Sequence, residues 1–123
     1  MLMAEIFLYL LAAHLIGDWI IQTAWMANEK SKHFAPLLVH VASYYIFTFG
    51  ALYLAGVDFT KAFWATLFLA VTHALLDNRR FEFWWLRRIK KVAEKDVPVW
   101  LLLGVDQSFH LILLFLVSFW LAR

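Results

Sequence analysis

The chain has 123 residues, of which 64% are hydrophobic and 16% are charged, and it contains no cysteine. A soluble domain is closer to half apolar, so this is the composition of a membrane protein, and the length allows one domain. The absence of cysteine excludes disulfides and thiolate metal sites. The net charge of only +2 hides a very uneven distribution of charge along the chain.

Four apolar runs in the sequence are long enough to cross a bilayer. The first covers about residues 3–25, and since no basic region precedes it and no small-residue cleavage site follows, we expect a retained span instead of a signal peptide. The others cover about residues 36–55, 60–77 and 98–121. The predicted fold class is therefore all-α, an integral membrane four-helix bundle.

Residues 79–95, between spans three and four, have a different pattern. Basic residues gather on one helical face, and an apolar face carries Phe81, Trp84, Trp85 and Ile89. This pattern predicts an interfacial amphipathic helix on a bilayer with anionic lipid head groups. A basic segment that binds nucleic acid is the alternative, and the two adjacent tryptophans favour the membrane, so we expect no nucleic-acid partner.

The basic residues also predict the topology. All of the 11 lysines and arginines except Lys61 and Arg123 fall in the links after spans one and three. Because basic links stay in the cytoplasm, both of these links are expected there, and both termini are expected outside.

Polar residues of the spans are concentrated toward the basic links. Three spans carry a histidine and an aspartate four residues apart, and span two carries a single histidine: His14 with Asp18, His73 with Asp77, Asp106 with His110, and His40. Residues at this spacing share one face of a helix. Counted from the basic links at about 1.5 Å per residue, most of these residues lie between ~5 and ~18 Å from the cytoplasmic surface. This placement predicts a polar cavity open to the cytoplasm and closed toward the outside by an almost apolar outer half.

These side chains suggest a metal site. An aspartate at mid-span costs roughly 2.5–3.5 kcal/mol, and a divalent ion compensates several carboxylates together. Imidazole and carboxylate are ligands for Zn²⁺, Mn²⁺ or Fe²⁺, so we expect one or two divalent metal ions. The expected metal ligands are His14, Asp18, Asp106 and His110. The expected catalytic acid/base groups, or a second metal position, are His40, His73 and Asp77. Gln22 and Gln107 are expected to support the ligands by hydrogen bonds. A structural network of aspartates and protonated histidines is the alternative.

Four motifs, in a distinctive order, resemble a known family. They are Ala13–His14–Leu15–Ile16–Gly17–Asp18 with Gln22 and Lys30–Ser31–Lys32, then Leu38–Val39–His40, then Thr72–His73–Ala74–Leu75–Leu76–Asp77, and then Val105–Asp106–Gln107–Ser108–Phe109–His110. The chain resembles a family of small bacterial and phage membrane proteins catalogued only as a domain of unknown function. The resemblance implies a four-span architecture and no established activity. We expect the protein to reside in the bacterial cytoplasmic (inner) membrane. A looser similarity, in the placing of histidine and aspartate in spans, is to membrane-bound metal-dependent hydrolases, whose motifs do not align residue by residue.

The cavity favours a metal-dependent hydrolase that acts on an amphiphilic or lipid-like substrate from the cytoplasmic side. Arg79 and Arg80 beside its mouth either steer a phosphate or serve the topology. An ion or proton channel or transporter formed by a homo-oligomer is a second hypothesis, since Ala13 and Gly17 permit close helix contacts. A non-catalytic membrane regulatory protein is a third.

Overall fold

A computed structural model describes residues 2–123, and within them the chain is helical and has no strand. The α-helices are α1 Met3–Leu15, α2 Ala24–Glu29, α3 Phe34–Leu54, α4 Phe59–Asp77, α5 Arg80–Arg88 and α6 Val99–Leu121. A π-helical turn, η1 (Ile16–Ile20), extends α1, and a 3₁₀ turn, η2 (Glu94–Asp96), precedes α6. Four helices, counting α1 and η1 as one, are long and apolar enough to span a membrane. The predicted all-α, four-span fold is confirmed.

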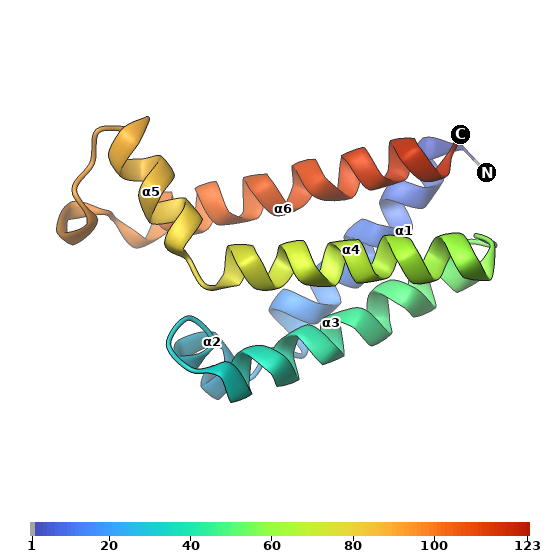
Figure 1. Cartoon of the computed structure of the whole chain (residues 1–123), viewed down its shortest axis with the longest axis horizontal. Coiled ribbons are helices and arrows are strands. Elements are labelled where there is room, and N and C mark those ends of the chain that lie inside the picture. The colour runs from blue at the N-terminus through green and yellow to red at the C-terminus, as the bar shows by residue number, and fades with distance from the viewer. Residues whose placement is uncertain (1) are drawn as a thin grey trace.

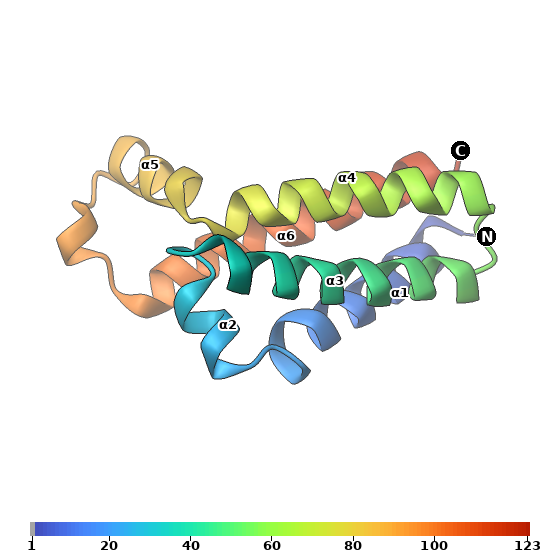
Figure 2. The same ribbon diagram turned by 60° about the horizontal axis from the view of Figure 1, so that its bottom comes forward.

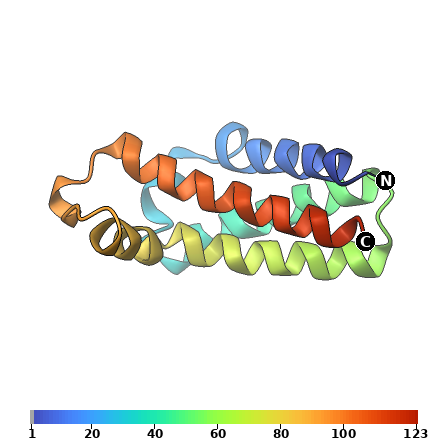
Figure 3. The ribbon, with the colours of Figure 1, turned by 90° about the horizontal axis from the view of Figure 1, so that it is seen from above.

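The four long helices form an antiparallel bundle. α1 packs against α3 and α6, and α4 packs against the same two helices, so α1 and α4 stand on opposite corners (Figure 1, Figure 3). Both termini lie at one end of the bundle, and the short helices α2 and α5 lie at the other (Figure 1, Figure 2). This alternation brings the last turns of α1 and α4 to the same level as the first turns of α3 and α6.

The bundle has two halves of different composition. The half near the termini, called the apolar half, has a core of large and small aliphatic side chains that includes Leu10, Leu52, Leu69 and Leu114. The half near α2 and α5, called the polar half, buries histidines, carboxylates and one lysine. The predicted concentration of polar groups at the end with the basic links is therefore present in the structure.

The first span ends earlier than the apolar run suggested, at Ile20 instead of Trp25. Two polar side chains explain the break. The amide of Gln22 donates to the backbone oxygen of Asp18 (2.9 Å) and satisfies a carbonyl at the end of the helix. The hydroxyl of Thr23 accepts from the backbone N–H of Met26 and caps α2, so Trp25 belongs to a new helix.

The segment between α4 and α6 is also less helical than expected, because α5 ends at Arg88 instead of residue 95. Lys91 adopts a left-handed backbone conformation (φ 58°), and the Val92 N–H bonds to the Leu86 oxygen, which is a common way to terminate a helix. α5 turns Glu82 and Leu86 toward the bundle. The expected membrane-facing residues are at least partly exposed, and their contact with lipid stays a prediction: Phe81, Trp84, Trp85 and Ile89.

Candidate metal centre

Each of the four spans brings polar side chains to one buried region in the polar half. All seven residues predicted from the spans are buried, and none is more than 6% exposed: His14, Asp18, His40, His73, Asp77, Asp106 and His110. The 3.6-residue repeat explains why the pairs point inward, since residues four apart share a face. The π-helical turn carries Asp18, and Gly17 in the same turn lets α1 approach α3, where an added Cβ would lie 3.3 Å from the Tyr44 ring.

Four ligand-type atoms from three helices converge most tightly, and we call this set the metal centre: Asp18 Oδ1, His40 Nε2, His73 Nε2 and Asp77 Oδ2. The two Nε2 atoms are 2.8 Å apart. Asp18 Oδ1 lies 3.2 Å from each of them. Asp77 Oδ2 lies 2.9 Å from His40 and 3.1 Å from His73. A tetrahedral zinc ion with bonds of about 2.0–2.1 Å separates its ligand atoms by about 3.3 Å, so the separations around the two Nε2 atoms are close to those of a metal site. Among the described residues, Asp18 and Asp77 belong to two candidate metal groups that share His73.

Hydrogen bonding alone does not satisfy this arrangement. A neutral imidazole Nε2 carries either one proton or one lone pair, so it can serve only one of the several polar atoms around it. The Nδ1 atoms of His40 and His73 make no hydrogen bond within residues 2–123. Packing holds the ring of His73 instead, because the Tyr44 ring stacks on it at a centroid distance of 3.9 Å. A cation at the centre would use all four lone pairs together.

The remaining predicted residues form a second layer beside the metal centre. Asp106 and His110 form a further group with Asp77 that could hold a metal ion, in which His110 Nε2 lies 3.8 Å from Asp77 Oδ1. Asp77 thus offers one oxygen to each group. The backbone oxygen of Asp106 accepts from His110 Nδ1 (2.8 Å) and leaves Nε2 of that ring directed at Asp77.

His14 and the two glutamines surround these groups. His14 Nε2 lies 2.9 Å from the side-chain oxygen of Gln107, whose amide nitrogen donates to Asp106 (3.0 Å) and Asp18 (3.4 Å). Gln107 therefore links α1 to α6, whereas Gln22 reaches only the backbone of α1. Within residues 2–123, no single candidate group contains His14, Asp18, Asp106 and His110 together. His14 and Asp18 group with His73 instead, and the ligand set expected from the sequence stays a prediction.

Sequence reasoning missed two charged residues of this region. Lys30, which the sequence analysis used for the topology and within a family motif but not as a site residue, is buried and lies 3.0 Å from Asp77 Oδ2 and 3.5 Å from His40 Nε2. The i, i+4 spacing that identified the other residues could not indicate Lys30, because Lys30 lies in an irregular turn before α3.

Glu82 on α5 is the second missed residue. It is fully buried, and neither of its carboxyl oxygens has a hydrogen-bond partner within residues 2–123. Burial and the nearby Asp106 carboxylate raise the pKa of Glu82 to about 8. The available signal was that Glu82 and Leu86 share a helical face, which the sequence analysis did not use.

Comparison with known proteins shows to which family the chain belongs. No curated protein and no solved structure matches the chain. A family model matches residues 6–123, which include all four spans and every residue of the metal centre, and confirms the resemblance seen in the motifs. The chain belongs to the family described as "Protein of unknown function (DUF3307)".

Proposed function

We propose that this membrane protein is a metal-dependent hydrolase whose divalent ion is bound by Asp18, His40, His73 and Asp77. The observation that carries the proposal is that the Nε2 atoms of His40 and His73 lie 2.8 Å apart and that each lies 2.9–3.2 Å from one oxygen of Asp18 and one of Asp77, across three helices. Two imidazoles and two carboxylates, without any thiolate, suit Zn²⁺, Mn²⁺ or Fe²⁺.

Charge supports a bound cation independently of the distances. Asp18, Asp77 and Asp106 are buried together, and Lys30 is the lysine that lies beside them. Three carboxylates against one ammonium leave an excess of two negative charges, which one divalent ion neutralises. Burying that excess without either a metal ion or protonated histidines would cost several kcal/mol per unpaired charge.

A hydrolase also needs a position for water. A tetrahedral ion with four protein ligands has no coordination position left for a water molecule. The group of Asp77, Asp106 and His110 supplies that position in the proposal. The distance of 3.8 Å between His110 Nε2 and Asp77 Oδ1 is longer than the separations in the metal centre. A water or a second ion would be held there, and Asp77 would contribute to both positions because one of its oxygens faces each group. A divalent ion held by these residues would make a bound water more acidic, to a pKa of about 7, and so would supply the nucleophile for hydrolysis. Asp106 or His110 would take the proton.

The packing of the apolar half favours a hydrolase over an ion pathway through one chain. The buried residues of that half are apolar except for Thr48, Thr66 and Ser118. The hydroxyl of Ser118 is already bonded to the Leu114 backbone oxygen. A transport pathway needs polar groups through both halves of the membrane, so the site resembles a chamber with access from one end.

Elemental analysis of the detergent-purified protein tests the proposal. The wild type should carry a stoichiometric transition metal, and His40→Ala and His73→Ala should lose it. His33→Ala is the matched control, because His33 is exposed and lies outside the site. Hydrolysis of amphiphilic phosphate and carboxylate esters should follow the metal content across these proteins. Full hydrolytic activity in the metal-free variants would refute the mechanism, and equal metal content in all four proteins would refute the site.

A further inference from the structure

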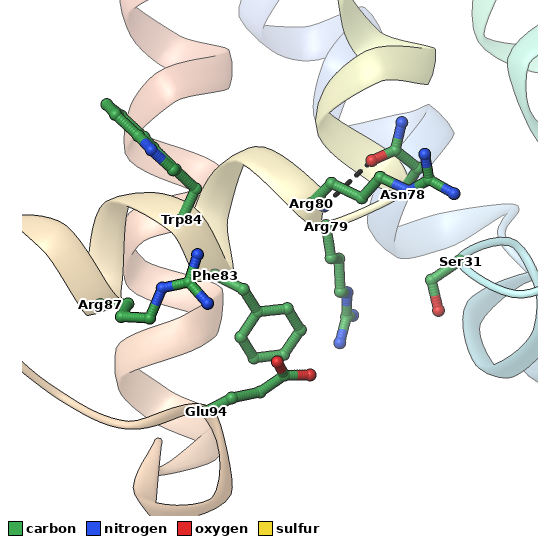
Figure 4. Close-up of a pocket in the computed structure, with 8 residues that line it drawn as sticks. All are labelled: Ser31, Asn78, Arg79, Arg80, Phe83, Trp84, Arg87 and Glu94. Atoms are coloured by element: carbon green, nitrogen blue, oxygen red, sulfur yellow. Dashed lines mark hydrogen bonds between the residues drawn. The ribbon is translucent and has the colours of Figure 1, made fainter.

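A cleft lies next to the metal centre, at the end of the bundle where α5 folds back (Figure 4). Its volume is about 550 Å³. The residues that line it come from the turn after α2, from the α4–α5 junction, from α5 and from η2: Ser31, Asn78, Arg79, Arg80, Phe83, Trp84, Arg87 and Glu94. We call it the arginine cleft.

The charge of the cleft is strongly positive. Arg79, Arg80 and Arg87 line it, and Glu94 is the single acidic residue of the lining. No salt bridge within residues 2–123 involves any of these arginines. Figure 4 shows the Arg79 side chain extending into the space between Phe83 and Ser31. The guanidinium groups are therefore available to an anion from outside the chain.

Arg79 holds its position through an unusual backbone conformation. Its φ is 63°, in the left-handed region, directly after the end of α4, and its N–H bonds to the Leu76 oxygen (2.9 Å). Glycine is the usual residue at this place after a helix, because a side chain is disfavoured there. An arginine in its place directs a guanidinium into the cleft, and such strained residues gather at ligand sites.

The chain connects the cleft to the metal centre at two points. Asn78 and Arg79 directly follow Asp77, and Ser31 directly follows Lys30. Lys30 and Asp77 are themselves in contact at 3.0 Å. A ligand bound to the arginines thus lies at the edge of the region that contains the ligand atoms.

We propose that the arginine cleft binds the phosphate group of an amphiphile, and that the substrate of the metal centre is a phosphorylated lipid. This inference rests on the proposed function, whose substrate class it specifies. A guanidinium group pairs with two oxygens of a phosphate or of a carboxylate. A phosphate has enough oxygens to engage more than one arginine at once, whereas a carboxylate has only two and a neutral head group has no charge. Phe83 and Trp84 add aromatic side chains to the lining of the cleft, and Trp84 is 45% exposed, so apolar surface for a lipid chain lies close to the arginines.

Binding of short-chain lipids to the full chain in detergent tests this proposal without requiring catalysis. Dioctanoyl phosphatidic acid, dioctanoylglycerol, glycerol phosphate and inorganic phosphate are titrated against tryptophan fluorescence. The phosphorylated lipid should bind, and dioctanoylglycerol should bind at least about tenfold more weakly. Inorganic phosphate or glycerol phosphate binding as tightly as the lipid would overturn the assignment to an amphiphile and indicate a soluble phosphate compound.

Variants distinguish binding in the arginine cleft from non-specific attraction of the anion to basic residues. Arg79→Gly removes a guanidinium and suits the left-handed backbone, so the fold should persist. Arg87→Gln removes a second one. Each should weaken binding of phosphatidic acid by about tenfold or more, since each removes a charged hydrogen-bonding group. Arg88→Gln is the matched control, because Arg88 is on the same helix but does not line the cleft. Equal affinity in Arg79→Gly, Arg87→Gln and Arg88→Gln would overturn the proposal.

The same titration on His40→Ala distinguishes the two proposals. Lipid binding that survives loss of the metal, with no hydrolysis in any protein, would leave the cleft assigned and refute the hydrolase. Metal-dependent hydrolysis with an unchanged KM in Arg79→Gly would support the hydrolase and refute the assignment of the cleft.

Discussion

The two halves of the bundle are built from the same four helices, but different forces hold them together. In the apolar half, side chains such as Leu10, Leu69 and Leu114 interdigitate, and dispersion contacts suffice. In the polar half, carboxylates and imidazoles face one another at 2.8–3.2 Å. Their mutual burial is favourable only when a cation or protons balance the charge. The comparison indicates that one half provides stability and the other provides a site whose stability depends on its ligand.

The largest expected effect is the response to a chelator. Removal of the ion should lower the melting temperature by about 10 °C or more, because a ligand present at 1,000 times its dissociation constant contributes about 4 kcal/mol. Thermal unfolding in detergent, with and without a chelator, measures the difference. A melting temperature that the chelator does not change in protein shown to have lost its metal would contradict the distinction between the halves.

Truncation of a side chain in the apolar half should lower the stability and leave the metal content unchanged. Leu114→Ala should destabilise the protein by about 2–5 kcal/mol, since it leaves a cavity in a packed core, while the metal content stays at the wild-type level. His73→Ala should abolish metal binding. Unfolding curves and elemental analysis on both variants check the pair, and loss of metal in Leu114→Ala would show that the halves are not independent.

Glu82 predicts a pH dependence. Its folded pKa of about 8 is raised above the ordinary value of 4.5, so the folded protein binds the proton more tightly than the unfolded chain. Stability from this group is fully present below about pH 4.5 and is lost as the pH rises to about 8. Because glutamine cannot titrate, the free energy of unfolding of chelator-treated Glu82→Gln should fall less between pH 5 and pH 8 than that of the chelator-treated wild type. Glu94→Gln is the exposed control. Parallel stability profiles for the wild type and Glu82→Gln would refute the assignment.

The smallest expected effect concerns the link between α1 and α6. Gln107→Ala removes the hydrogen bonds to His14, Asp18 and Asp106 but no atom of the metal centre. Metal affinity should fall by about 10–100-fold, as is typical when a group that orients ligands is lost. Competition with a metal indicator measures the change. Gln22→Ala, which disturbs only a backbone contact, should cause less.

Much of this architecture could be predicted from the sequence, since apolar length determined the four spans and the i, i+4 pairs indicated which faces turn inward. The grouping of ligands could not be predicted. It depends on how far each helix rotates and on the π-helical turn that carries Asp18, neither of which follows from periodicity. Polar residues outside the spans were the second difficulty, because Lys30 and Glu82 enter the site through tertiary packing of a turn and a short helix.

The central claim is that Asp18, His40, His73 and Asp77 share one divalent ion. X-ray absorption spectroscopy of the metal-loaded, detergent-purified protein tests this most directly, because imidazole ligands give a distinctive outer-shell signal. The structure predicts a shell of nitrogen and oxygen ligands at about 2.0–2.2 Å with imidazole scattering that His40→Ala and His73→Ala abolish. A shell of oxygen alone, or an imidazole signal unchanged in both variants, would contradict the claim.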